Sequence, residues 1–457
     1  MVAKIFHEAV STQCVKTNYL RGEFMKIIVI GAGHGGLQTA KVLAKKGYDV
    51  SVFEKSPKNC VSYDWRDDVE PTVFEKLGIP VPQNSFRTDC PSLFAPLSDL
   101  PLYVSSEENT REWNLERTAF VHLLCDLAEK EGAKVFFEKK VERLILENNA
   151  VKGVVVDGEN IYADLVIDSS GLDSPFRGEI PQTFGITKSV KSDEAFTVYR
   201  AYVQPREGVE KPEKHARRVY LKFLGQPGIA WCICEPDGVI NILVGQVGGM
   251  SEGVLNSSLS ELKKLNPIIG DKVLRGGQVV RIPVRYPLTK MVAKGYVVIG
   301  DSACMTVPMI GSGISNSLRA GQILGEEIIK ANSVSLQTLW NYQVRYYLEI
   351  GAEHFMIDNL KRMLLKADNE DIKYMFESGA ITEEDMHSMT AGGSLKLTPK
   401  SIMNKVCKGI KKFGFLVKFG ITALKGMKAQ KLAKKIPTVY NEKKINKWQR
   451  KLEKKFN

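Results

Sequence analysis

The segment Met25–Gly36 constrains the fold more than any other part of the chain. Residues 26–30 (KIIVI) are a short, β-branched apolar run that ends at a glycine, as buried parallel strands do. Gly31, Gly33 and Gly36 follow in GxGxxG spacing, and the composition after them predicts a helix. In this spacing the first glycine permits a tight turn, the second lets the backbone approach a pyrophosphate, and the third lets helix and strand pack closely. The segment therefore predicts the start of a dinucleotide-binding unit.

A second predicted strand completes this unit. The predicted strand at 48–53 is followed directly by Glu54, which lies 23 residues beyond Gly31. An acid at that place can accept hydrogen bonds from an adenosine ribose, and the free N–H groups at the helix start suit phosphates. The motif by itself does not separate FAD from NAD.

Two later segments favour a flavin. Residues 163–171 (ADLVIDSSG) and 295–303 (GYVVIGDSA) are apolar strands that run into polar turns. Asp301, at the end of the second, can hold the ribityl chain of a flavin, and the glycine-rich start of the helix after it can direct a positive dipole end at the pyrimidine edge of the ring. The alternative is a strand-end turn that binds nothing, but its pairing with the N-terminal unit favours flavin binding.

These residues resemble the geranylgeranyl reductase family, within the flavoproteins built like p-hydroxybenzoate hydroxylase, over most of residues 25–345. The matching pieces are GAGHGG with Glu54, WNLERTAF at 113–120, DSSG at 168–171, and GDSACMTVPMIGSGISNSLRAG from Gly300. The resemblance implies that Arg117 lies beside the cofactor and that Asp301 binds the ribityl chain. Pro308 and the glycines after it would lie near the isoalloxazine ring.

The implied fold class is α/β, with a Rossmann-type FAD-binding domain, an antiparallel β-sheet substrate domain and a helical, basic C-terminal region. The expected cofactor is FAD, and no metal site is expected. The residues expected to bind FAD are Gly31, Gly33, His34, Gly35, Gly36, Glu54, Lys55, Arg117, Gly171, Gly300, Asp301, Pro308, Gly311, Gly313 and Ile314.

The domain organisation is expected to be discontinuous. The predicted parts are an N-terminal extension (1–24), a first part of the FAD-binding domain (25–180), a substrate-binding β-sheet domain (181–277), a second part of the FAD-binding domain (278–335), a helical C-terminal domain (336–398) and a basic amphipathic tail (399–457). Within the substrate domain, strands are predicted at 196–203, 218–224 and 239–244.

One segment of the predicted substrate domain resembles this family in particular. Residues 228–236 (GIAWCICEP) are similar to the family's Y-x-W-x-F-P segment, with Trp231 in the place of its tryptophan. Ile229 replaces the tyrosine, Glu235 replaces the phenylalanine, and Val247 stands where a glycine is usual. These departures leave the exact substrate open.

The resemblance also nominates two catalytic residues, Cys60 and Trp231. Cys60 lies roughly where related reductases place a cysteine near the flavin, although Val61 stands in place of the following glycine. The alternative for Cys60 is a small buried residue without chemistry.

The implied activity is reduction of carbon–carbon double bonds in an isoprenoid or other apolar lipid, with NAD(P)H or a ferredoxin-like protein as electron donor. A flavin monooxygenase is the alternative, although such enzymes usually carry Asp-Gly where this chain has Ser170-Gly171. A halogenase is disfavoured because its W-x-W-x-I-P segment is absent. A non-enzymatic electron-relay flavoprotein stays open.

The C-terminal tail concentrates the positive charge. Residues 399–457 contain eighteen lysines and arginines against two glutamates, whereas the whole chain has a net charge of +12. Apolar residues from Ile402 to Met427 follow helical spacing, with lysines expected on the opposite side, and Ile445, Trp448, Leu452 and Phe456 form a narrower stripe. This pattern is typical of a helix in a membrane interface, so we expect peripheral membrane contact through 401–457. The alternatives are a helix packed on the domain and, less favoured, nucleic-acid binding.

The remaining features set the compartment. The eight cysteines have no CxxC spacing, which favours reduced thiols in a cytosolic protein and gives no support to a zinc site. The start of the chain lacks the apolar core of a signal peptide, and no apolar run is long enough for a transmembrane helix. We therefore expect a cytoplasmic protein at the inner face of the cell membrane.

Overall fold

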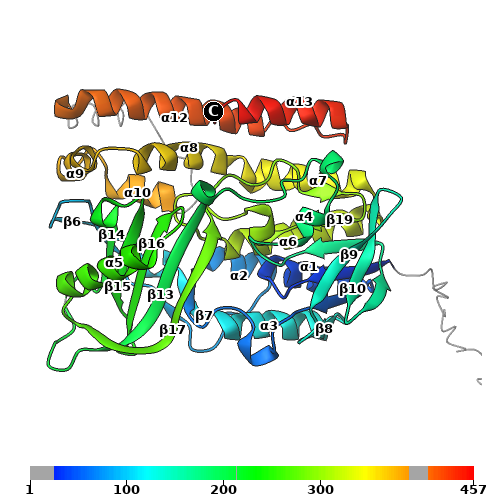
Figure 1. Cartoon of the computed structure of the whole chain (residues 1–457), viewed down its shortest axis with the longest axis horizontal. Coiled ribbons are helices and arrows are strands. Elements are labelled where there is room, and N and C mark those ends of the chain that lie inside the picture. Colours follow the sequence, from blue (N-terminus) through cyan, green and yellow to red (C-terminus); the bar gives the residue numbers. More distant parts are fainter. Residues whose placement is uncertain (1–24, 213, 391–409, 457) are drawn as a thin grey trace, which may run out of the picture.

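The computed structural model describes residues 25–212, 214–390 and 410–456. It has an α/β body built around two large sheets, and a layer of C-terminal helices lies along one side of both (Figure 1). The predicted fold class is confirmed.

The first large sheet contains the predicted nucleotide-binding strands. Its strand order is β18-β19-β12-β1-β2-β8, and all neighbours are parallel except β18 and β19. The strands are β1 (Lys26–Ile30), β2 (Asp49–Phe53), β8 (Lys134–Phe136), β12 (Leu165–Asp168), β18 (Val292–Ala293) and β19 (Tyr296–Val298). The apolar side chains of these strands are buried, as expected for a parallel sheet covered by helices, except in the edge strand β8, where Phe136 is exposed. The helices that belong to this body are α1 (His34–Ala44), α2 (Pro71–Leu77), α3 (Arg117–Lys130), α4 (Phe176–Glu179) and α6 (Ile314–Ala331).

The second large sheet has the order β17-β13-β16-β15-β14-β5-β6. Its strands are β5 (Ser92–Phe94), β6 (Pro101–Tyr103), β13 (Ala195–Pro205), β14 (Arg217–Leu221), β15 (Gly228–Cys234), β16 (Ile240–Val247) and β17 (Ile269–Pro283), and α5 (Glu252–Leu265) packs against β15 and β16. The strands predicted within 181–277 all lie in this sheet.

Two parts of this sheet correct the predicted division of the chain. β5 and β6 lie inside the stretch 25–180, which the sequence assigned to the FAD-binding domain, and β17 runs past the boundary at 277. Strands of three residues are too short to show an alternating pattern, and β5 pairs in parallel with β14, more than a hundred residues away. Only the tertiary structure decides such a pairing.

Two small sheets complete the body. One is β11-β10-β9, and the other, β3-β7-β4, supplies polar side chains to the cavity described below. Their strands are β3 (Arg66–Val69), β4 (Phe86–Arg87), β7 (Trp113–Glu116), β9 (Val141–Glu147), β10 (Ala150–Val156) and β11 (Glu159–Tyr162).

The C-terminal region is helical, as predicted. Its helices are α7 (Leu336–Tyr346), α8 (Glu353–Leu365), α9 (Asn369–Glu377), α10 (Glu383–Thr390), α12 (Phe413–Ala433) and α13 (Glu442–Glu453). α12 packs along α8, and α12 and α13 follow each other as the outermost layer in Figure 1. In the part of the chain that the structure describes, no helix combines the length and apolar character needed to cross a membrane.

The structure corrects the predicted tail in two ways. The stripe Ile445, Trp448 and Leu452 of α13 is buried in the main core, and the Trp448 indole N–H donates to the Leu432 carbonyl at 2.9 Å. This stripe therefore packs on the protein because apolar side chains of the core meet it there. The lysines of α12 flank its exposed apolar face and do not lie opposite it, since the opposite face packs on α8. The predicted helical residues at 401–409 lie outside the described residues.

Candidate active site

The glycines after β1 form a cradle that no side chain could enter. Gly31 has a φ of +84°, and its N–H donates to the Phe53 carbonyl at 2.8 Å. A Cβ on Gly33 would lie 2.3 Å from Ser169 Oγ, and one on Gly36 would lie 2.7 Å from Val29 Cγ1. α1 begins at His34, directly after Gly33, so the free N–H groups and the positive dipole end of the helix lie at this loop. A bound anion could accept hydrogen bonds from them.

Glu54 closes one edge of this cradle. It follows β2, and its side chain accepts hydrogen bonds from the N–H groups of Ala32 (2.9 Å) and Ser56 (2.8 Å). Two backbone donors hold the carboxylate in place beside the glycine turn, and its oxygens keep lone pairs for hydroxyl donors. Lys55, the next residue, is exposed at the rim of the same cavity.

His34 is the first residue of α1 and is buried, with its ring 5.6 Å from that of Phe120. Burial, with a smaller contribution from the Arg117 charge, lowers its pKa to about 3. The imidazole is therefore neutral near pH 7. Its Nε2 has no hydrogen-bond partner among the described residues, and the side chain lines the cavity. An orphaned buried nitrogen at this place fits a site that a polar group would complete.

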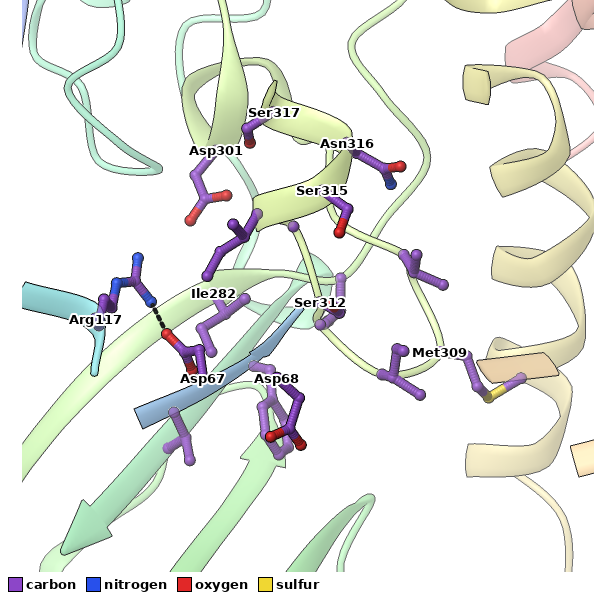
Figure 2. Close-up of a pocket in the computed structure, with 18 of the residues that line it drawn as sticks. Asp67, Asp68, Arg117, Ile282, Asp301, Met309, Ser312, Ser315, Asn316 and Ser317 are labelled. Carbon is purple, nitrogen blue, oxygen red and sulfur yellow. Dashed lines mark hydrogen bonds and ion pairs between the residues drawn. The ribbon is translucent and has the colours of Figure 1, made fainter. Parts of the chain in front are cut away.

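Figure 2 shows the charged groups on the other side of the cavity, where Asp301 lies near an ion pair between Arg117 and Asp67. Arg117 Nη1 is 2.8 Å from Asp67 Oδ2, and its Nε donates to Ser62 Oγ at 2.8 Å. Asp301 lies in a single 3₁₀ turn, Gly300–Ala303. Burial raises the pKa of Asp301, and the Arg117 charge partly offsets that increase.

The loop at 308–313 leads from Asp301 into α6. It closes on itself through a hydrogen bond from the Val307 N–H to the Ser312 carbonyl (2.8 Å), and Gly311 has a φ of +70°. A Cβ on Gly313, the residue before α6, would lie 2.8 Å from Thr306 Cγ2. Further along α6, a Cβ on Gly321 would lie 2.3 Å from the carbonyl oxygen of Gly35, so α6 packs tightly on α1. This contact brings two helix N-termini to the same cavity.

The cavity has a volume of about 1310 Å³ and joins the two large sheets. Every residue predicted to bind FAD lines it, except Gly36, which supports the loop from behind. The second sheet contributes mainly apolar side chains, namely Phe196, Val198, Trp231, Leu243 and Ile282.

Both predicted catalytic residues line this cavity. Cys60 is exposed and ends a 3₁₀ turn, Lys58–Cys60, so the alternative of a buried cysteine is wrong. Trp231 is half-buried, its indole N–H donates to Asn241 Oδ1 at 3.1 Å, and the Arg200 guanidinium lies 5.1 Å from its ring. The structure brings the two residues to one cavity, and their catalytic roles stay predictions.

The sequence analysis missed a polar wall of the same cavity. Asp68 of β3 forms an ion pair with Arg217 of β14 and accepts a hydrogen bond from Asn114 Nδ2 at 2.6 Å. Glu112 lies beside them, and burial together with the Asp68 charge raises its pKa to about 7. An available signal was Arg200, a charged residue inside the otherwise uncharged strand β13, which pairs with Asp67 at 3.2 Å.

These residues fit FAD. The glycine cradle has no room for side chains, two helix N-termini face the cavity, and a held carboxylate and an orphaned imidazole nitrogen stand at one end of it. Such a set suits the phosphates, ribose and ribityl chain of a dinucleotide.

Comparison with known proteins gives a consistent result. Residues 29–79 match the family model for an NAD(P)-binding Rossmann-like domain. The digeranylgeranylglycerophospholipid reductase of Sulfolobus acidocaldarius is 25% identical over 416 residues, which cover 87% of this chain and 90% of the relative. The enzyme of the same name from Methanothrix thermoacetophila is 26% identical, covering 82% and 97%.

Solved structures share the fold. A geranylgeranyl bacteriochlorophyll reductase-like protein of Thermoplasma acidophilum superposes with a TM-score of 0.70 at 19% identity, covering 87% of this chain and 98% of that one. A myxobacterial chondrochloren halogenase, a variant of FAD-dependent halogenases, has a TM-score of 0.57 at 16% identity, covering 86% and 97%. The predicted resemblance to the geranylgeranyl reductase family of FAD-dependent oxidoreductases is thus confirmed over most of the chain.

Proposed function

We propose that this protein is an FAD-dependent oxidoreductase that reduces carbon–carbon double bonds of an isoprenoid or similar apolar lipid. One observation carries the proposal most directly: a single cavity joins the FAD-type cradle to an apolar wall formed by a second sheet and the C-terminal helices. The similarity over most of its length to digeranylgeranylglycerophospholipid reductases supports the same substrate class.

The proposed cofactor contacts follow from the positions of the side chains. The glycine cradle and the α1 N-terminus would hold the pyrophosphate, Glu54 the ribose, and Asp301 with Arg117 the ribityl side. When bound, FAD supplies hydride chemistry that no side chain of the protein can provide.

The protein's own residues would prepare the substrate and keep water out. Leu243 and Ile282 of the sheet, and Leu364 and Phe376 of the C-terminal helices, line the cavity with apolar surface. A prenyl chain gains stability by burying its methylene and methyl groups there, at about 0.8 kcal/mol for each CH₂. A dry pocket also protects a reduced cofactor from side reactions.

Reduction of an alkene needs a proton as well as a hydride, and Cys60 is our candidate to hold that proton. Its thiol lies at the cavity rim, next to the loop that carries Ser62 and Tyr63. Trp231, on the opposite sheet, would orient the substrate through its ring face.

Besides the substrate, we propose two further partners, an electron donor and a membrane surface. The electron donor would be NAD(P)H or a ferredoxin-like protein. The protein would be cytoplasmic and contact the inner face of the cell membrane through residues 401–457, whose charge is strongly basic.

A flavin monooxygenase is the second candidate, because a probable FAD-dependent monooxygenase from Pseudomonas aeruginosa shares the fold, with a TM-score of 0.57 at 16% identity. The two activities differ in their need for oxygen, so one experiment separates them.

The test uses the purified full-length protein with its flavin reduced by dithionite under strict anaerobiosis. A geranylgeranyl lipid is added, flavin absorbance is followed, and the product is weighed by mass spectrometry. We expect reoxidation without oxygen and a mass gain of about two hydrogens for each double bond reduced. A fully saturated analogue of the same lipid is the control and should leave the flavin reduced.

If reoxidation requires oxygen with every prenyl lipid, the reductase proposal is wrong. A product one oxygen atom heavier would then establish the monooxygenase.

A further inference from the structure

Helix α12 has two apolar faces, and one of them packs on the protein. Phe415, Ala423 and Ala429 are buried on this inner face. A Cβ on Gly426 would lie only 3.1 Å from Met356 Cα of α8, so the two helix backbones approach closely. This contact fixes which side of α12 points away from the protein.

The outer face of α12 is also apolar, and it is exposed. Five large side chains separated by four, four, three and three residues lie on it, with between 43% and 59% of their surface accessible. They are Phe413, Val417, Ile421, Leu424 and Met427. Steps of three and four residues place them in one stripe along the helix. No other described residue covers this stripe, and a contiguous exposed apolar stripe marks an interaction surface.

Charge indicates what this stripe faces. Exposed lysines flank it at Lys418, Lys425 and Lys428, and others continue past its end along α13. Between Lys411 and Lys455 there are fifteen lysines and arginines against two glutamates. α12 and α13 form the outermost layer of the molecule (Figure 1), so the apolar stripe and the basic groups can meet one extended surface together. An apolar stripe bordered by lysines is complementary to an anionic lipid bilayer.

The same helix also reaches the substrate cavity. Phe419 points to the inner side of α12, packs with Phe415 and the side chains of α8 and α9, and lines the cavity. Leu364 of α8, Phe376 of α9 and Met386 of α10 belong to both this cluster and the cavity wall. The cavity is therefore bounded by the helix whose other face is exposed and apolar.

We propose that α12 docks on an anionic lipid surface through its outer stripe, and that a lipid substrate passes from the bilayer into the cavity beside Phe419. The docking step stands on the surface of α12 alone, whereas the entry step rests on the proposed function. Docking would put the outer face of α12 at the headgroup and acyl-chain boundary. The cavity, on the inner side of the same helix, would then lie next to the bilayer surface, which shortens the path of a prenyl chain through water.

Docking is tested by flotation of the FAD-loaded full-length protein with vesicles of phosphatidylcholine, with and without about 30% phosphatidylglycerol. The double variant Ile421→Glu/Leu424→Glu puts two charges into the stripe, and its bound fraction on anionic vesicles should fall at least about tenfold. The triple variant Lys418→Gln/Lys425→Gln/Lys428→Gln removes three of the fifteen basic groups and should show a weaker preference for anionic vesicles than the wild type.

The matched control is Leu265→Glu, a change at a leucine that is 44% exposed at the end of α5. α5 packs on β15 and β16 and lies apart from α12 in Figure 1. The control variant should bind vesicles as the wild type does. Equal binding of the stripe variant and the wild type would overturn the docking proposal. So would a wild-type dimer in sedimentation analysis that the stripe variant converts to monomer, because the face would then bind a second copy.

Entry is tested by the same variants with two presentations of a geranylgeranyl lipid. The stripe variant should reduce the lipid normally in detergent micelles and at least about tenfold more slowly in anionic vesicles. Equal rates in both presentations would contradict entry from the bilayer. Vesicle binding by the wild type without turnover in either presentation would refute the proposed function and leave docking supported.

Discussion

At the scale of single residues, the cradle for the cofactor depends on the absence of a side chain. Gly33 has the backbone of Ser169 on one side and the start of α1 on the other, and a Cβ would lie 2.3 Å from Ser169 Oγ and 2.7 Å from its carbonyl oxygen. The first atom can rotate away, but the second belongs to the backbone. The loop can lie this close to the end of β12 only because the residue is glycine, and a side chain would push the loop out of the position that suits a pyrophosphate.

The variant Gly33→Ala tests this reading. We expect at least about tenfold weaker FAD binding, equivalent to about 1.4 kcal/mol, with an unchanged far-UV circular dichroism spectrum. Flavin fluorescence titration of the cofactor-depleted protein measures the affinity. Gly253→Ala, at a glycine with no atom within 4 Å of the added carbon, is the control and should bind FAD normally. Wild-type affinity in Gly33→Ala would show that the loop does not contact the phosphates.

Glu112 shows a second consequence of local environment. Its pKa is raised to about 7 by burial and by the Asp68 carboxylate, so the folded protein retains this proton to a higher pH than the unfolded chain does. Between about pH 4.5 and 7 the folded state therefore binds more protons, and stability falls as the pH rises through this window.

The variant Glu112→Gln lacks the titrating carboxyl and so loses this dependence. Its free energy of unfolding should gain about 2 kcal/mol relative to wild type between pH 5 and pH 8. Urea unfolding of the FAD-loaded protein at both pH values measures the difference. Glu107→Gln, at an exposed position, should follow the wild type at each pH. A constant offset between Glu112→Gln and wild type would contradict the proposed titration.

At the scale of elements, α12 and α13 show that similar amphipathic patterns can be buried in one helix and exposed in another. Both carry apolar residues at helical spacing among lysines, yet the α13 stripe lies in the core and the α12 stripe is exposed. Trp448 of α13 contacts Tyr347 at 5.4 Å between ring centroids, and its indole N–H is satisfied by a backbone carbonyl. Its role is packing.

Trp448→Ala should therefore destabilise the protein by about 3 to 5 kcal/mol, the usual range for removing a buried tryptophan. Leu424→Ala, in the exposed stripe of α12, should change stability by no more than about 0.5 kcal/mol. Chemical denaturation of the two variants compares them. Similar losses at both positions would mean that the α12 stripe is covered by another part of the chain.

The elements also differ in how well the sequence predicts them. The strands on either side of the glycine loop, the strand before Asp301 and the C-terminal helices were predictable, because each has a local signal several residues long. β5 and β6 were not, since a three-residue strand has no period to recognise and its partner β14 is distant in sequence.

At the scale of the whole molecule, the cavity is the product of parts that are far apart in the chain. The glycine loop after β1, the 308–313 loop and the second sheet meet there, and the C-terminal helices close the far side of the cavity. Arg117 was found from a family resemblance and does contact the cavity. No sequence motif marked its ion pair with Asp67. The same is true of the polar wall made by Asp68, Glu112 and Arg217, because these residues are far apart in the chain.

The sequence by itself determined the nucleotide-binding unit, the carboxylates at the strand ends and the basic, helical C-terminus. These features rest on the spacing of nearby residues, and backbone geometry converts such spacing directly into structure. Only the tertiary structure decided which apolar stripe is buried, which sheet receives the short strands and which polar groups share the cavity. Those outcomes depend on contacts between distant residues, because burial and pairing are settled by whatever surface the rest of the fold presents.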